Sequence, residues 1–278
     1  MSEGRASSPG DAASSSRENV TASGSTEVIL RTEGLSKSYS LGKRRTVNAL
    51  KEIDLEIKRG EFVAVMGLSG SGKTTLLNIL ACLDKPSSGK LFLDNADLSS
   101  LGESQLYKIR RDKIGFVFQS FNLLPYLNAR ENVELALEST KSSKSERRTL
   151  ARELLSLVGL SGREEHRPSQ LSAGEQQRVA IARALANNPT IILADELTGN
   201  LDGKTKYEIM KLLVKLNTSQ GTTIVVVTHD NQIAAETERV LRLKDGRIEK
   251  ERAGNLAKRK QTQQSKKGPA GRSSALTT

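Results

Sequence analysis

The stretch that decides the fold is Gly67-Leu-Ser-Gly-Ser-Gly-Lys-Thr-Thr75, which directly follows the apolar run Phe62–Met66. It fits the phosphate-loop pattern of two glycines five residues apart, followed by a lysine and a hydroxyl side chain. Glycines let the backbone bend so tightly that several N–H groups converge on phosphate oxygens. Lys73 then brings a positive charge to the β- and γ-phosphates, and the hydroxyl of Thr74 is a ligand for Mg²⁺. The stretch therefore predicts a nucleoside triphosphate site between a buried strand and the start of a helix.

Apolar runs and helical stretches alternate along the middle of the chain. Ile191–Ala194 and Ile224–Val227 are continuous apolar runs, as in strands that are covered on both faces. Thr74–Leu83, Glu175–Leu185 and Lys204–Leu216 have helical patterns. Because strands that alternate with helices form parallel sheets, the fold class is α/β, with a phosphate-loop NTPase core.

Two further patterns add subdomains to this core. Apolar residues alternate with charged ones from Ile53 to Ile57, which predicts a half-buried antiparallel strand. The pair Asp245-Gly246 between two apolar segments predicts a tight hairpin turn. Residues from about 120 to 170 are mostly polar with helical spacing, so we expect a largely helical subdomain inserted into the core.

Composition divides the chain into three zones. Residues 1–27 are rich in Ser, Gly and Ala and predict a disordered extension, whereas residues 28–251 carry all the regular hydrophobic patterning of a folded domain. Residues 252–278 contain seven basic and no acidic residues, so this expected disordered tail carries most of the net charge of +11. Aromatic residues make up only 3%, which argues against a base-stacking surface for nucleic acid. No apolar run approaches the ~18–20 residues that a membrane-spanning helix needs.

Two acidic residues follow the apolar run Ile191–Ala194. They are Asp195 and Glu196. The strand-end acid of phosphate-loop enzymes holds Mg²⁺, and this role falls to Asp195. Glu196 is then placed to orient or deprotonate the attacking water, which typically contributes ~10²–10⁴ in rate. Alone, such a pair is more often a surface turn, but with the phosphate loop upstream it indicates hydrolysis of the nucleotide.

The segment Leu171-Ser-Ala-Gly-Glu175, continued by Gln-Gln-Arg-Val-Ala-Ile-Ala-Arg-Ala-Leu185, resembles the signature motif of ATP-binding cassette (ABC) proteins. The resemblance covers roughly residues 28–251 and implies the ABC ATPase fold, ATP hydrolysis, and ATP and Mg²⁺ as cofactors. In this family the motif contacts the γ-phosphate of an ATP that a partner cassette holds. A helix start suits this contact, because its backbone N–H groups attract an anion.

Further positions match the motifs of the family in chain order. Gln119 matches a glutamine that senses Mg²⁺, and His229 matches a histidine that contacts the γ-phosphate. Tyr39 resembles the aromatic residue that stacks on adenine, and Asp202 ends a loop that communicates across the dimer. His166 has no place in this series and is interpreted as a surface residue. The resemblance assigns catalysis to Lys73, Gln119, Glu196 and His229, and metal binding to Thr74, Gln119 and Asp195. It assigns nucleotide binding to Tyr39, Gly67, Leu68, Ser69, Gly70, Ser71, Gly72, Lys73, Thr74, Thr75, Ser172, Gly174 and Asp202.

The chain departs from the family pattern at two positions. Ala173 replaces the usual second glycine of the signature, and its methyl group is expected to be tolerated because the contacts come from its neighbours. Leu197 replaces the proline that usually follows the acidic pair. Losing that fixed φ is expected to loosen the loop that holds Glu196.

The segments Leu76–Gly89, Ile114–Pro125 and Asn128–Leu137 resemble the subgroup of ABC ATPases that drives lipoprotein release, macrolide export and antimicrobial-peptide resistance. This resemblance implies a second ABC ATPase subunit in a homodimer and an integral membrane permease subunit. It also implies a peripheral place on the cytoplasmic face of a membrane, and export of a lipoprotein, peptide or drug. One alternative is a cell-division-type ABC ATPase without a transported substrate. Another is an ABC ATPase that acts on nucleic acid through the basic tail, although the chain lacks the tandem cassettes or coiled coils of such proteins.

The apolar residues after Gln119 allow two interpretations. Phe121, Leu123, Leu124 and Tyr126 either receive the membrane subunit or belong to the core of the helical subdomain. Apolar residues more often mean burial than contact with a partner.

Overall fold

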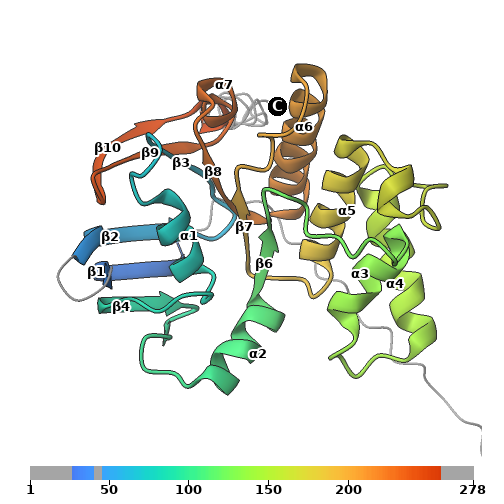
Figure 1. The fold of residues 1–278 in the computed structure, drawn as a ribbon, viewed down its shortest axis with the longest axis horizontal. Coiled ribbons are helices and arrows are strands. Elements are labelled where there is room, and N and C mark those ends of the chain that lie inside the picture. Colours follow the sequence, from blue (N-terminus) through green and yellow to red (C-terminus); the bar gives the residue numbers. More distant parts are fainter. Residues whose placement is uncertain (1–26, 41–45, 258–278) are drawn as a thin grey trace, which may run out of the picture.

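A computed structural model describes residues 27–40 and 46–257, which form two β-sheets with helices around them (Figure 1). The larger sheet has the strand order β10-β9-β3-β8-β7-β6, and its neighbours are parallel except for β9 and β10. The smaller sheet is antiparallel with the order β2-β1-β4-β5. The strands are β1 (Val28–Ser40), β2 (Thr46–Lys58), β3 (Phe62–Met66), β4 (Ser88–Leu93), β5 (Ala96–Asp97), β6 (Ile114–Val117), β7 (Ile191–Asp195), β8 (Thr223–Thr228), β9 (Arg239–Lys244) and β10 (Arg247–Ala253).

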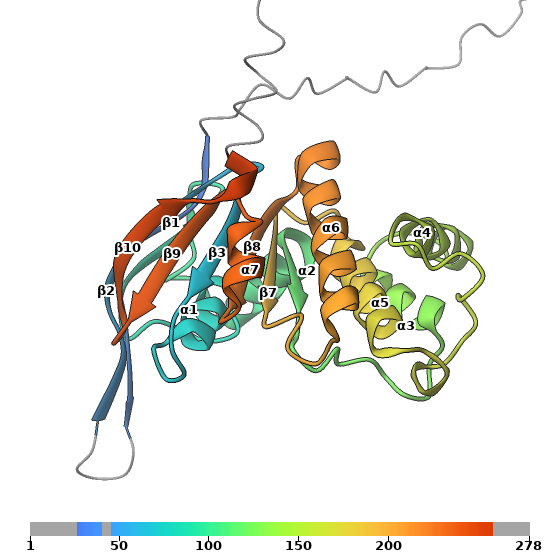
Figure 2. The same ribbon diagram turned by 90° about the horizontal axis from the view of Figure 1, so that it is seen from above.

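Helices cover both faces of the larger sheet. Figure 2 shows α3, α4 and α5 gathered at one end of the molecule, beyond α6, with the smaller sheet at the other end. None of the helices in the described ranges combines the length and the apolar character that crossing a bilayer requires. The helices are α1 (Lys73–Leu80), α2 (Glu103–Lys113), α3 (Ala129–Leu137), α4 (Lys144–Leu157), α5 (Ala173–Leu185), α6 (Gly203–Gln220) and α7 (Asn231–Ala235), with a 3-10 turn at Pro168–Gln170.

The central strands are buried on both faces, which explains their unbroken apolar runs. In β3, Phe62 and Ala64 belong to a core that includes residues of α3 to α7. Val63 and Val65 point to a second core, which includes residues of α1 and the smaller sheet. The α/β fold predicted from the sequence, with its added antiparallel sheet, is confirmed.

The hairpin predicted at Asp245-Gly246 joins β9 to β10. Asp245 has φ 49° and Gly246 has φ 79°, and Lys244 pairs with Arg247 across the two-residue turn. Two positive φ values are typical of the turn type whose twist matches the flanking strands.

The folded part of the chain runs further than composition indicates. Strand β10 continues to Ala253, and Leu256 is buried against the larger core. The expectation that a disordered tail begins at residue 252 is therefore wrong for residues 252–257. Residues 1–26 and 258–278, on which the rest of the two expected disordered segments falls, lie outside the described residues.

The region expected to be helical contains α3, α4 and the 3-10 turn. Both helices begin with a capping box, formed by Asn128 with Glu131 and by Ser143 with Glu146. These reciprocal bonds satisfy backbone N–H groups that a helix start leaves unpaired. The local polar pattern thus accounts for where both helices start.

Candidate nucleotide site

The phosphate loop connects β3 to α1 and is tightly packed beneath its glycines. Gly72 caps α1 with φ 101°, and a Cβ atom there would lie 2.4 Å from the carbonyl oxygen of Ala49. A Cβ atom on Gly67 would lie 2.3 Å from the carbonyl oxygen of Leu243. Both positions therefore exclude any side chain, and glycine lets the loop curl over the start of the helix.

Lys73 is held inside the loop. Its Nζ atom donates to the carbonyl oxygens of Gly67 and Leu68, both at 2.9 Å, and the residue is 7% exposed. Leu68 and Ser69 are exposed at the tip, whereas the buried Oγ atom of Ser71 has no hydrogen-bond partner within the described chain. The buried ammonium group and the unpaired hydroxyl suit a phosphate group, because each can donate to its oxygens.

Asp195 lies at the end of β7 beside the phosphate loop. Burial raises the pKa of its carboxyl group, and the nearby Glu196 adds to the rise, whereas a hydrogen bond from Thr74 and the charge of Lys73 oppose it. The buried Oδ1 atom of Asp195 has no hydrogen-bond partner in the part of the chain that the structure describes. A buried carboxylate oxygen without a partner, next to a hydroxyl group, suits a divalent cation.

The wider surroundings of Asp195 also fit Mg²⁺. Among residues 27–40 and 46–257, no three His, Cys, Asp or Glu side chains come together as a metal cage. Mg²⁺ is usually bound by one or two carboxylates together with phosphates of a substrate and not by an all-protein cage. A carboxylate beside a hydroxyl group, as in Asp195 and Thr74, therefore fits Mg²⁺ that arrives with a nucleotide.

Glu196 is the meeting point of three strand ends. The Nε2 atom of Gln119, which follows β6, lies 3.3 Å from one carboxylate oxygen of Glu196. The Nδ1 atom of His229, which follows β8, lies 3.2 Å from the other. Glu196 itself has φ 40°, and its backbone N–H donates to Val227. Carboxyl ends of parallel strands share one edge of a sheet, so residues far apart in the sequence meet here.

Tyr39 lies at the end of β1, close to the start of α1. Its hydroxyl donates to Asp84 at 2.7 Å, and the Nζ atom of Lys37 lies 4.9 Å from the ring centroid. Burial and the bond to Asp84 raise the pKa of Tyr39, whereas a hydrogen bond involving Thr75 opposes the rise. The ring is 38% exposed, so it is anchored at its hydroxyl end and open beside the loop.

The signature segment lies apart from the phosphate loop of the same chain. Helix α5 contributes to the core on one face of the larger sheet, whereas α1 contributes to the core on the other face, and Figures 1 and 2 both show them well separated. Ser172 caps α5 and accepts a bond from the N–H of Glu175. The chain thus does not bring Ser172 and Gly174 together with its own phosphate loop.

Asp202 packs next to the signature segment and caps α6. Its carboxylate accepts bonds from the N–H groups of Lys204 and Thr205 and, at 2.6 Å, from the hydroxyl of Thr205. These bonds, led by the Thr205 hydroxyl, lower the pKa of Asp202. The Cγ2 methyl of Thr205 lies 2.5 Å from where a Cβ atom on Gly174 would be. Thr205, which no motif singles out, therefore joins Asp202 to Gly174.

The two departures from the family pattern are accommodated differently. Ala173 is exposed in the first turn of α5, so its methyl group meets no crowding. Leu197 is 4% exposed and belongs to the larger core, and the N–H of Gly199 donates to the carbonyl of Glu196. The buried Leu197 side chain and this turn bond are the contacts that hold the loop in place of the φ restriction of a proline, and the expected loosening stays a prediction.

The segment after Gln119 is held by a residue that sequence reasoning missed. Arg183 of α5 donates to the carbonyl oxygens of Phe121 at 2.8 Å and Asn122 at 2.5 Å. Burial lowers the pKa of Arg183. Phe121 and Leu123 pack against the larger core, whereas Tyr126 is 66% exposed. The apolar residues after Gln119 are thus partly core and partly surface.

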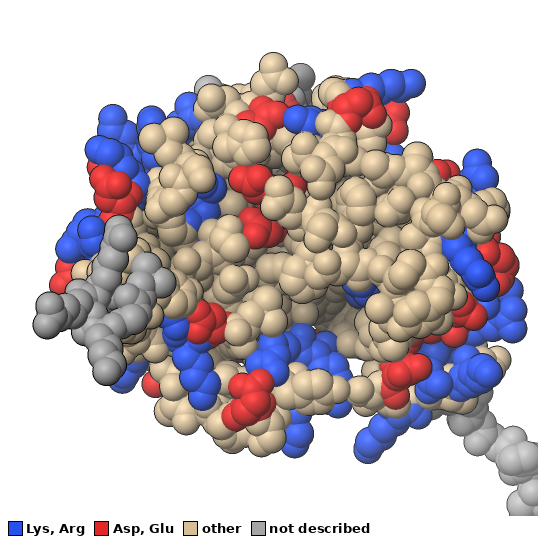
Figure 3. All heavy atoms as spheres, in the orientation of Figure 1, with Lys and Arg blue, Asp and Glu red and all other residues tan. Residues whose placement is uncertain are grey.

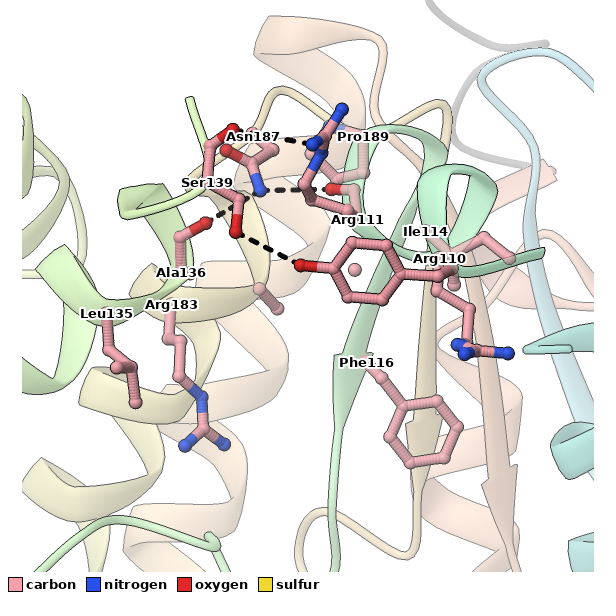
Figure 4. A pocket seen from close by; sticks show the side chains of 13 residues that line it. Arg110, Arg111, Ile114, Phe116, Leu135, Ala136, Ser139, Arg183, Asn187 and Pro189 are labelled. Carbon is pink, nitrogen blue, oxygen red and sulfur yellow. Dashed lines mark hydrogen bonds between the residues drawn. The ribbon is translucent and has the colours of Figure 1, made fainter. Parts of the chain in front are cut away.

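A cleft of about 350 Å³ lies next to this segment and away from the phosphate loop. Figure 4 shows Leu135 and Arg183 on one side of it and Arg110 and Phe116 on the other. Figure 3 shows the hollow between the part of the surface formed by α2 and the part formed by α3, with basic side chains at its margin. The cleft is therefore a surface feature distinct from the nucleotide site.

Comparisons with known proteins agree with this geometry. The family model described as ABC transporter matches residues 50–199. The chain is 54% identical over 227 residues to the uncharacterized ABC transporter ATP-binding protein MJ0796 of Methanocaldococcus jannaschii. The aligned region covers 80% of this chain and 96% of that protein. It is 49% identical over 220 residues to the macrolide export ATP-binding/permease protein MacB of Wolinella succinogenes. That aligned region covers 79% of this chain but 34% of MacB.

A solved structure is similar over nearly its whole length. The dimeric structure of a post-hydrolysis state of the ATP-binding cassette MJ0796, bound to ADP and Pi, has a TM-score of 0.75 and 52% identity. The similarity covers 81% of this chain and 98% of that chain. This chain therefore belongs to the ABC transporter family, and it is an ATP-binding and ATP-hydrolysing cassette.

Proposed function

We propose that two copies of this chain clamp two Mg-ATP molecules head to tail and drive a separate membrane subunit. The observation that carries the proposal is the position of Ser172 and Gly174, on a helix that packs on the opposite face of the sheet from α1. A γ-phosphate bound at Lys73 would reach such a helix start only if a second copy supplied it. The dimeric structures described for MJ0796, one of them bound to ADP and Pi, support a pair of cassettes.

The residues around the phosphate loop divide the chemistry between them. Backbone N–H groups of residues 67–75 and the Lys73 ammonium bind the phosphates. Thr74, Asp195 and Gln119 would hold Mg²⁺, which neutralises phosphate charge when it is bound. Glu196 accepts a proton from the water that attacks the γ-phosphate. Gln119 and His229, which contact one carboxylate oxygen of Glu196 each, keep that carboxylate oriented.

Tyr39 would provide the contact with the base. Lys37 and Asp84 hold the ring of Tyr39 in place through its face and its hydroxyl group. The part of the ring that stays exposed would stack on adenine. Stacking on a π-face tolerates any base, so this contact adds affinity more than selectivity.

The membrane subunit would dock at the cleft between α2, α3 and α5. Exposed Tyr126 lies after Gln119, and Arg183 links the cleft to the backbone of residues 121 and 122. The printed name of MacB, an ATP-binding/permease protein, supports a permease partner. Such a partner would place the chain at the cytoplasmic face of a membrane, where lipoprotein, peptide or drug export are the candidate tasks.

Substituting Glu196 by glutamine tests this function. The variant should bind ATP normally, slow hydrolysis by at least ~100-fold, and accumulate as an ATP-dependent dimer in sedimentation velocity. Glu138→Gln, the same change at an exposed carboxyl group of a helix end, should behave as the parent. Unchanged turnover in Glu196→Gln would remove Glu196 from the mechanism, and a variant that stays monomeric with ATP would contradict the clamp.

A further inference from the structure

The signature segment carries a negative charge directly beside the serine to which a phosphate is expected to bind. The Oε2 atom of Glu175 accepts bonds from the backbone N–H of Ser172 at 2.8 Å and from its hydroxyl at 2.9 Å. The backbone bond from Ser172 is the largest influence that lowers the pKa of Glu175. The carboxylate is therefore ionised near neutral pH and directly attached to Ser172.

This charge conflicts with the proposed role of Ser172. Under the head-to-tail clamp, the Ser172 hydroxyl must turn its proton from Glu175 to a γ-phosphate oxygen. The carboxylate and the phosphate would then lie on either side of one serine, and two like charges at that separation repel each other. The favourable end of the helix dipole offsets only part of this repulsion.

Arg163 lies on the other side of the same carboxylate. Its Nε atom is 3.2 Å from Oε1 of Glu175, so each oxygen of the carboxylate has its own partner. The Nη1 atom of Arg163 is 3.2 Å from Nε2 of His166, which steadies the guanidinium from the loop before α5. His166, interpreted from the sequence as a surface residue, thus belongs to a chain of contacts that ends at Ser172.

We propose that Arg163 is a positioning residue that neutralises Glu175 and thereby allows Ser172 and Gly174 to bind the γ-phosphate held by a second copy. The inference rests on the proposed head-to-tail clamp. Arg163 keeps the carboxylate on the backbone N–H of Ser172 and frees the serine hydroxyl for the phosphate. An uncharged residue at position 175 would remove the need for Arg163.

The test measures the ATP-dependent dimer in the Glu196→Gln background by sedimentation equilibrium. Loss of one part-exposed ion pair weakens an interaction by up to about 5-fold. Arg163→Ala should therefore raise the dimer dissociation constant by about 5-fold if one of the two composite sites dominates, and by about 25-fold if both contribute. Arg163→Lys should keep most of the affinity. Arg163→Ala combined with Glu175→Gln should restore the dimer to the strength of Glu175→Gln alone. ATP binding to the monomer should be the same in every variant.

Arg152→Ala is the matched control. The variant removes one positive charge from the same helical region. The Arg152 side chain is 52% exposed, against 50% for Arg163, but it contacts Glu165 and not Glu175. A dimer that Arg163→Ala and Arg152→Ala weaken equally would overturn the inference, as would failure of Glu175→Gln to rescue Arg163→Ala. If the Glu196→Gln parent itself fails to dimerise with ATP, the proposed clamp falls and the role of Arg163 falls with it.

Discussion

Replacing Gly174 by alanine tests how closely the signature segment packs against the loop of Asp202. The new Cβ atom would lie 2.5 Å from the Cγ2 methyl of Thr205, and Thr205 is held in place because its hydroxyl donates to Asp202 at 2.6 Å. Overpacking of this kind costs about 1–3 kcal/mol. For a domain of this size, that lowers Tm by roughly 2–12 °C.

The Thr205→Ser background separates this clash from other effects of the substitution. Serine removes Cγ2 and keeps the hydroxyl that bonds to Asp202, so the added methyl group has space. In that background Gly174→Ala should be neutral or stabilise by up to about 1 kcal/mol, because alanine favours the helix over glycine. Thermal unfolding of the parent, the two single variants and the double variant measures both effects. An equal loss of Tm in both backgrounds would refute the Thr205 contact as the cause.

Two further predictions concern the nucleotide site. Burial raises the pKa of Asp195 in the folded protein, so ionising this carboxyl group costs stability. The free energy of unfolding therefore falls as pH rises from the unfolded pKa near 3.8 to the higher folded pKa. Asp195→Asn should therefore raise Tm at pH 7 without Mg²⁺ and nucleotide, with a gain that shrinks as pH approaches 3.8; an unchanged Tm at pH 7 would contradict the cost of burying this charge. The chain has no tryptophan, so Tyr39→Trp introduces a single indole fluorophore. ATP should quench its emission by stacking whereas inorganic triphosphate should not, and equal responses to both ligands would exclude a base contact at residue 39.

The buried strands were open to prediction because their signal is local and unbroken. Phe62–Met66 agrees with β3 at both ends, and Ile224–Val227 lies within β8. Helix α2, by contrast, buries only Leu106 along its length. Only the partly buried Ile109 joins it in packing against the core, so the apolar period is too short to identify the helix by spacing alone. The end of the domain is hidden from the sequence for a similar reason, since the burial of Leu256 depends on a distant core.

Some parts of the candidate site can be predicted from continuous motifs, whereas others depend on contacts between distant segments. The phosphate loop and the acidic pair are continuous motifs, and the alignment of strand ends explains why Gln119, Glu196 and His229 meet. The contacts of Arg163 with Glu175 and of Arg183 with residues 121 and 122 join segments without a shared motif. Spacing along the chain does not encode such contacts, because they depend on how the helices pack.

In the proposed dimer, each triphosphate lies between the phosphate loop of one copy and Ser172–Gly174 of another. Two variants, each inactive alone, test it directly. Lys73→Ala removes the phosphate contact, and Ser172→Asp keeps a helix-capping side chain while placing a negative charge toward the phosphate.

An equimolar mixture of the two variants is the decisive measurement. Half of the dimers formed by random association would be mixed, and each mixed dimer would contain one intact composite site of two. The mixture should therefore recover ATPase activity, up to about a quarter of the parent rate. A mixture that stays as inactive as either variant alone would contradict a nucleotide site shared between two copies.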